Sequence, residues 1–209
     1  MGVLLTIPNF ILRDATPADA PVLARLANMA GEGLPAHLWA GMAEQGQSAF
    51  DVGAARAART EGAFSWCNAR VLTWQGAVVG AAIFYDLTEI PTADDIRTTP
   101  PLLRPLVELE AEVPGTRYLN VLAVVPQARR RGVAKRLIAD IRSPDDLDLT
   151  LIVASENLTA RTFYAREGFD ELARRPMGPG GPSDLKGDWI LMRRRSGQRV
   201  GMDGPIPSS

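Results

Sequence analysis

The chain has 209 residues, of which 46% are hydrophobic and 22% are charged. This composition is that of an ordinary globular protein and argues against the disordered, collagen-like and fibrous classes. Lysine and arginine number 23 against 24 aspartates and glutamates, so the net charge is −1 and no overall positive field attracts nucleic acid or an anionic membrane.

The N-terminal segment MGVLLTIPNFILRD predicts neither a signal peptide nor a transmembrane helix. It has no basic region at its start, and Pro8, Asn9 and Arg13 interrupt its apolar run. We therefore expect a cytoplasmic protein.

The first third of the chain predicts one strand and three short helices. A strand is expected over Phe10 to Leu12, and Thr16 followed by a proline and an acidic first turn is typical of a helix start. Pro35 begins a second helical stretch, and Asp51 is expected to cap a third helix over residues 54–59.

A β-hairpin is predicted from Ala69 to Tyr85, with its turn at Gln75-Gly76. Residues 88–115 contain five prolines and an acidic, leucine-bearing stretch from Leu102 to Glu112. We expect this segment to be an inserted loop and short helix at the surface.

The second half of the chain alternates between strand and helix patterns, which predicts parallel pairing with right-handed crossovers. The expected elements are a strand over Tyr118 to Val125, a helix ending at Ile141, a strand over Leu149 to Val153, a helix over Asn157 to Glu167, and closing strands over Phe169 to Leu172 and Asp188 to Met192. At roughly 100 to 200 residues per domain, we expect a single domain over residues 1–196 and a disordered tail over residues 197–209.

The strand ending at Val125 delivers the chain to a basic turn, Arg129-Arg130-Arg131-Gly132, that precedes a helix. Free backbone amides and the positive end of the helix dipole meet there, which predicts an anion site. Small residues at Gly132 and Ala134 allow a phosphate to approach the backbone. The turn matches neither a P-loop nor a dinucleotide-binding fingerprint. The alternative is an exposed helix start with solvated arginines.

A second pattern follows at Asn157-x-x-Ala160-x-x-Phe163-Tyr164-x-x-x-Gly168-Phe169. With this pattern and Arg129-x-x-Gly132-x-Ala134, the chain resembles the GNAT superfamily of N-acetyltransferases. The resemblance extends over residues 9–193 and is strongest from Tyr118 to Phe169.

The resemblance implies an α/β fold of the GNAT type. Its six- or seven-stranded sheet is mixed and mostly antiparallel, carries helices on both faces, and splays between its two central parallel strands. It also implies acetyl-CoA as co-substrate, with pantetheine along the first of those strands and the pyrophosphate on the backbone of the basic turn. The implied cofactor-binding residues are Leu122, Ala123, Val124, Arg129, Arg130, Arg131, Gly132, Val133, Ala134, Lys135, Asn157 and Tyr164.

The resemblance also implies that Tyr164 donates a proton to the departing CoA thiolate. The acceptor amine must lose a proton before it can attack, because an ammonium has no lone pair. Tyr118, Asn120 and Leu122 occupy alternating positions of the strand before the turn, and none is a carboxylate. We assign Asn120 to a water relay and leave the base open. The three glutamates of residues 108–112 are more typical of a solvated helix face.

The function implied is direct transfer of an acetyl group to a primary amine. The acceptor is expected over residues 30–38, the hairpin and the loop of residues 176–187, where Glu32 either contacts a cationic acceptor or lies in a plain turn. A single cysteine, Cys67, and a single histidine, His37, argue against a zinc site, and no metal is expected.

Two alternatives stay open. One is a non-catalytic acyl-CoA-binding or ligand-sensing module of the same fold. The other is an RNA-associated protein that uses Arg129 to Arg131 and Arg193 to Arg195, although we expect no nucleic-acid or membrane partner. The acceptor and the oligomeric state, including a homodimer, are also left open.

Overall fold

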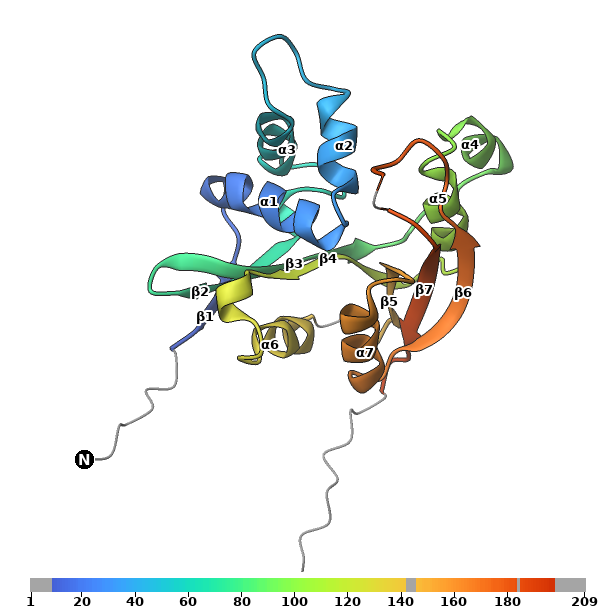
Figure 1. The fold of residues 1–209 in the computed structure, drawn as a ribbon. Helices are drawn as coiled ribbons and strands as arrows, with labels where there is room; N and C mark the ends of the chain where they lie inside the picture. The colour runs from blue at the N-terminus through green and yellow to red at the C-terminus, as the bar shows by residue number, and fades with distance from the viewer. Residues whose placement is uncertain (1–8, 142–145, 184, 198–209) are drawn as a thin grey trace, which may run out of the picture.

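The computed structural model describes residues 9–141, 146–183 and 185–197. Within these residues, seven strands form one sheet in the order β1-β2-β3-β4-β5-β7-β6 (Figure 1). The strands are β1 (Ile11–Asp14), β2 (Ala69–Trp74), β3 (Ala77–Asp86), β4 (Arg117–Val124), β5 (Leu149–Ala154), β6 (Asp170–Pro176) and β7 (Asp188–Arg194). The β4–β5 pair is parallel and the other neighbouring pairs are antiparallel. The predicted mixed, mostly antiparallel sheet is confirmed.

Helices cover both faces of this sheet, as expected (Figure 1). They are α1 (Ala20–Ala30), α2 (Leu34–Ala40), α3 (Ala49–Ala57), α4 (Ala93–Thr98), α5 (Arg104–Glu110), α6 (Val133–Asp140) and α7 (Leu158–Arg166), with short 3₁₀ turns η1 (Pro17–Asp19), η2 (Trp66–Asn68) and η3 (Pro126–Ala128). Side chains of α1 and α3 pack on β2, β3 and β4 on one face. Side chains of α6 and α7 pack on the other face. Residues 1–8 and most of the expected tail, residues 198–209, lie outside the described residues.

Two helix starts show how local sequence sets the element boundaries. At the first, the predicted cap is confirmed: the Thr16 hydroxyl and backbone N–H both donate to Asp19, at 3.0 and 2.7 Å. The predicted start of the third helix is wrong, because α3 begins at Ala49 with Ser48 as its cap. The carboxylate of Asp51 accepts from the Ser48 backbone at 2.8 Å, so Asp51 is the third-position partner of a capping box.

The β2–β3 hairpin confirms the predicted turn. Gln75 and Gly76 both adopt positive φ, 51° and 79°. Two consecutive residues of positive φ match the twist of the flanking strands and keep a two-residue connection tight.

The segment of residues 88–115 differs from the expected surface excursion. It contains both α4 and α5, and Leu109 of α5 is fully buried in a cluster with Trp189 and Leu191 of β7. Leu34 of α2 belongs to the same cluster, so α5 covers the β6–β7 end of the face that carries α1 and α2. The segment therefore completes the core on that side.

Candidate functional site

The parallel strands β4 and β5 are paired only at their beginnings. Arg117 pairs with Leu149 and Tyr118 with Thr150. After these residues β4 and β5 are no longer paired with each other, and they continue to Val124 and Ala154. We call the unpaired segments, Leu119–Val124 and Leu151–Ala154, the fork. The fork is the divergence that the resemblance implied, and backbone groups on its two inner edges are left without strand partners.

A β-bulge at Asn120 changes which side chains share a face of β4. Val121 pairs with Ile83 and Leu119 with Phe84, so Asn120 is an extra residue on β4. The expected alternation of Tyr118, Asn120 and Leu122 is therefore wrong. Leu119 and Leu122 pack in the core under α6 and α7, on the same face as each other. Asn120 is exposed, and its Nδ2 donates to Tyr85 Oη at 3.2 Å.

The register with β3 decides which backbone groups of β4 face the fork. The Val125 amide donates to Val79 at 2.9 Å, and hydrogen-bonded pairs alternate along an antiparallel ladder. The backbone of Ala123 therefore bonds to β3, whereas those of Leu122 and Val124 point into the fork. The Val124 carbonyl accepts from Arg129 Nε at 3.2 Å, which leaves its N–H available.

The basic turn ends at the predicted helix start. Arg130 and Gly132 adopt positive φ, 59° and 78°, and Gly132 is the N-cap of α6. The backbone amides of residues 130–135 donate to no acceptor in the described part of the chain. Several N–H groups and the positive helix end thus lie together at an exposed position, which suits an anion.

The arginines of the turn are not equivalent. Arg129 Nη2 contacts Met29 of α1, with a distance of 3.5 Å to the sulfur. The Arg131 guanidinium lies over the Trp74 ring, 5.4 Å from its centroid. Both side chains are therefore supported by neighbouring elements, which argues against freely solvated arginines at these two positions.

Asn157 connects α7 to the bend between α1 and α2. Its Oδ1 accepts from the Ala160 amide at 3.0 Å and so caps α7. Its Nδ2 donates to Glu32 Oε1 at 2.6 Å. Glu32 has φ 54°, and the following Gly33 has φ 85°. Glu32 thus contacts the start of α7 and is more than a plain turn residue.

Tyr164 is buried on the face of α7 that packs against the sheet. Its ring contacts Phe163 and Phe169, with centroids 5.4 and 5.6 Å away. Burial raises the pKa of its hydroxyl above the ordinary value. The phenol therefore stays protonated at any ordinary pH and is available as a hydrogen-bond donor.

Two of the three segments expected around the acceptor meet in the structure. His37 Nε2 is 2.8 Å from the Gly180 carbonyl oxygen, which joins α2 to the loop between β6 and β7. Leu34 packs in the same cluster as Met177 and Leu185 of that loop. The third expected segment, the hairpin, carries Tyr85 on β3, whose ring lies 5.6 Å from that of Tyr118. The contact between the two tyrosines was not expected from the sequence, because it depends on the β3–β4 register.

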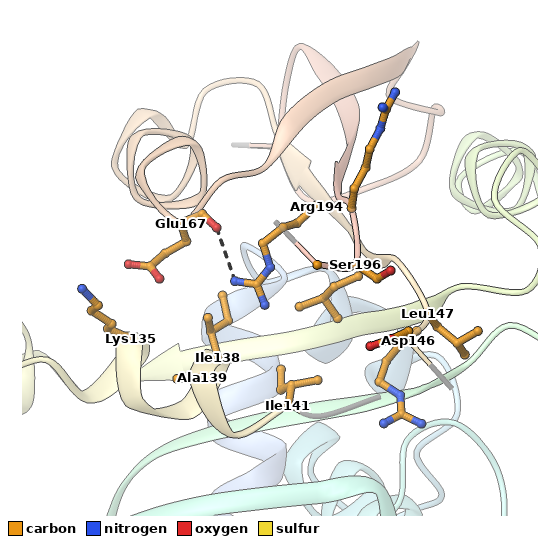
Figure 2. A pocket seen from close by; sticks show the side chains of 13 residues that line it. Lys135, Ile138, Ala139, Ile141, Asp146, Leu147, Glu167, Arg194 and Ser196 are labelled. Carbon is orange, nitrogen blue, oxygen red and sulfur yellow. Dashed lines mark hydrogen bonds between the residues drawn. The ribbon is translucent and has the colours of Figure 1, made fainter. Parts of the chain in front are cut away.

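A separate cavity of about 350 Å³ lies beyond the closed end of the fork, between α6, β5, α7 and the end of β7 (Figure 2). Lys135 is the one predicted cofactor-binding residue that lines it. Arg194 also lines it, donates to the Glu167 carbonyl at 3.3 Å and lies 5.1 Å from the Phe169 ring centroid. The arginine run at the end of β7 is thus partly packed, which weakens its proposed role in RNA binding.

Comparisons with known proteins support the resemblance. Residues 110–178, which contain both sequence patterns, match the family model described as an acetyltransferase (GNAT) domain. No curated protein matches the chain. Among the described residues, no helix is long and apolar enough to cross a membrane, and no group of three or more His, Cys, Asp or Glu side chains is placed to hold a metal.

Solved structures share the fold over nearly their whole length. An N-acetyltransferase from Staphylococcus aureus Mu50 is 16% identical with a TM-score of 0.61, over 88% of this chain and 99% of that one. An agmatine N-acetyltransferase is 16% identical with a TM-score of 0.59, over 90% and 99%. The ribosomal-protein-S18-alanine N-acetyltransferase of Escherichia coli is 17% identical with a TM-score of 0.54, over 94% and 99%. The fold and the family resemblance predicted from the sequence are confirmed.

Proposed function

We propose that this chain, whose residues 110–178 match a GNAT acetyltransferase domain, is an N-acetyltransferase that moves the acetyl group of acetyl-CoA to a primary amine. The observation that carries the proposal is the fork between β4 and β5, with the free amides of the Gly132 turn at the start of α6. A strand edge and an anion site of this kind fit the two ends of an extended pantetheine diphosphate.

The co-substrate is assigned to residues along this path. Leu122 and Val124 offer the backbone groups that face the fork, with Ala123 holding them on β3. The amides of residues 130–135, including Val133, Ala134 and Lys135, bind the pyrophosphate, and Arg129, Arg130 and Arg131 add positive charge. Asn157 has its Oδ1 engaged as a cap and one Nδ2 hydrogen engaged with Glu32. Its second Nδ2 hydrogen serves the pantetheine arm.

The chemistry follows from these positions. The neutral amine forms a bond to the thioester carbonyl carbon, and the carbon–sulfur bond breaks as the amide forms. The nitrogen gives up one proton to solvent in this step, and the departing thiolate takes up one, so the protons balance. Backbone N–H groups near Val124 polarise the carbonyl oxygen. The Tyr164 hydroxyl donates a hydrogen bond to the departing thiolate. Asn120, on the bulge, orients the water that relays the proton lost by the acceptor ammonium. No step in this scheme uses a metal.

The non-catalytic alternative rests on the same cleft and on the lack of a carboxylate on the fork segment of β4. A binding module and an enzyme differ in thiol release, which the free CoA thiol reports directly. Agmatine and a peptide that begins with alanine are the first acceptors to test, because structural relatives are named for them. The single domain over residues 1–196 and the cytoplasmic location belong to the same proposal.

The decisive experiment is calorimetric titration of wild type and two Gly132 variants with acetyl-CoA and CoA. Gly132→Ala carries the backbone strain of a side chain at positive φ, and its added Cβ meets no atom within 4 Å. Gly132→Glu carries the same strain plus a carboxylate beside the pyrophosphate. We expect Gly132→Ala to bind weakly and Gly132→Glu at least tenfold more weakly still, about 1.4 kcal/mol. Failure of wild type to bind acetyl-CoA would overturn the proposal.

A further inference from the structure

Three glutamates on α5 and just after it separate into two environments. Glu108 and Glu112 contact Arg175 of β6, at 3.5 and 2.5 Å, on the outer side of the helix. Side chains turn by about 100° per residue along a helix, so Glu110 lies on the opposite side from this pair. It is half-buried and has no ion-pair partner in the described part of the chain. Glu112 is exposed, as expected of a solvated face, whereas Glu108 and Glu110 are both partly buried. Glu108 differs from Glu110 in its ion pair with Arg175.

The inward side of α5 places Glu110 beside two tyrosines of the sheet. Tyr118 is 5% exposed, and the nearby Glu110 carboxylate raises the pKa of its hydroxyl and that of Tyr85. The two tyrosine rings are in edge contact, and Tyr85 Oη accepts from Asn120 Nδ2. Glu110, Tyr118, Tyr85 and Asn120 are thus neighbouring polar side chains between α5 and the bulge of the fork.

Within the described ranges, the charged groups around α5 leave the Glu110 carboxylate without a cationic partner. Arg175 on β6 is engaged with Glu108 and Glu112. On α4, Arg97 pairs with Asp94, at 2.6 Å. Burial raises the pKa of Glu110, and the hydrogen bond from Tyr118 offsets part of that rise. An unpaired carboxylate in such a place is costly, and a raised pKa makes it a better proton acceptor near neutrality.

We infer that Glu110 takes up the proton that the acceptor ammonium must lose, acting through the hydroxyls of Tyr118 and Tyr85. The inference rests on the proposed function and deepens it, because it supplies the base that the fork strand lacks. An N–H bond of the ammonium breaks, and the proton passes by way of the water at Asn120 and the tyrosine hydroxyls to a Glu110 carboxylate oxygen. After transfer, Glu110 returns the proton to solvent. Because it acts through other groups, Glu110 is a positioning residue.

The test compares Glu110→Gln with the matched variant Glu108→Gln. Thiol release from acetyl-CoA is measured from pH 6 to 9 with agmatine, with an alanine-first peptide and with water as acceptor. We expect Glu110→Gln to lower kcat/KM by about 10- to 100-fold at pH 7 and to remove the acidic limb of the pH profile. Glu108→Gln should keep kcat/KM within about twofold of wild type and retain the acidic limb, because its partner Arg175 also contacts Glu112. Tyr118→Phe should also remove the acidic limb of the pH profile, and Glu110→Asp should retain part of that limb.

Two controls separate this inference from the function and from folding. Acetyl-CoA affinity should be equal in wild type and Glu110→Gln, since Glu110 lies outside the cofactor path. Gln is neutral and of similar size, so the variant should unfold at or above the wild-type temperature at pH 7. Equal rates and equal pH profiles for Glu110→Gln and wild type, with wild type active, would overturn the inference alone. Absence of thiol release by wild type with all three acceptors would overturn the proposed function and this inference with it.

Discussion

The side chain of Asn157 donates from Nδ2 to Oε1 of Glu32, 125 positions earlier in the sequence, at 2.6 Å. The same side chain accepts a hydrogen bond from the Ala160 amide and so caps the N-terminus of α7. One amide therefore fixes both the start of a helix beside the fork and the position of the bend between α1 and α2. The wall expected to face the acceptor is tied to the cofactor side of the site by this contact.

Replacing Asn157 should separate these two roles. Asn157→Ala removes the cap and the link, and we expect a loss of about 1 kcal/mol, or a fall in Tm of about 2 to 4 °C. Asn157→Asp keeps a cap acceptor and sets a carboxylate against Glu32. Thermal unfolding of Asn157→Asp alone and combined with Glu32→Gln measures the repulsion. If the double variant is no more stable than Asn157→Asp, the side chains at positions 157 and 32 do not interact appreciably.

The sequence predicts the fold correctly where local chemistry decides it. The hairpin turn at Gln75-Gly76, the cap at Thr16 and the helix start after Gly132 all depend on residues within a few positions, and all are confirmed. The segment of residues 88–115 is different. Its prolines and acids indicate a surface loop, but the burial of Leu109 depends on β7, about 80 residues later in the printed sequence, which no local pattern reveals.

Truncating Leu109 tests whether α5 is part of the core. Leu109 is fully buried, so Leu109→Ala should lower the free energy of unfolding by about 2 to 5 kcal/mol. Ile90, in the same segment, is 64% exposed. Ile90→Ala should therefore change the free energy of unfolding by less than about 0.5 kcal/mol. Urea denaturation of the two variants gives the comparison. Equal free energies of unfolding for the two variants would show that the segment is not part of the core.

The candidate site shows the same division between local and long-range information. The Arg129-to-Ala134 and Asn157-to-Phe169 patterns identify the cofactor side, because each lies within one turn or helix. The acceptor side depends on the bulge at Asn120, which exists only relative to β3. Without that register, Tyr85 cannot be placed beside Asn120. Distinguishing Glu110 from Glu108 and Glu112 depends in turn on Arg175 of β6, which lies far along the sequence.

Acid should weaken the contact between Asp19 and Arg13. The Arg13 guanidinium donates to both Asp19 oxygens, at 2.7 and 2.9 Å, and with the Thr16 hydrogen bonds it lowers the pKa of Asp19 to about 2. A carboxyl whose folded pKa is lowered adds stability above its unfolded pKa of about 3.9, and that stability is lost as the pH falls toward the folded value. Asp19→Asn should therefore be clearly less stable than wild type at pH 7, with a difference that narrows from pH 4 to pH 2. Urea denaturation at pH 7, 4 and 2.5 checks this, and a difference that does not change with pH would exclude the carboxylate as its source.

Tyr164→Phe should slow the proposed reaction without abolishing it. The raised pKa keeps the phenol protonated, so it is always ready to donate a hydrogen bond to the thiolate. The same raised pKa makes full proton transfer to a thiol of pKa about 8.5 unfavourable, and such a thiol leaves readily without a strong acid. We therefore expect kcat to fall by about tenfold while the acetyl-CoA Kd changes by less than about threefold, since the ring contacts with Phe163 and Phe169 remain. Stopped-flow thiol detection and calorimetry measure the two quantities. Phe163→Leu is the packing control, because it removes a ring beside Tyr164 and leaves the hydroxyl in place. A Tyr164→Phe enzyme with wild-type kcat would show that the hydrogen bond from Tyr164 does not assist departure of the thiolate.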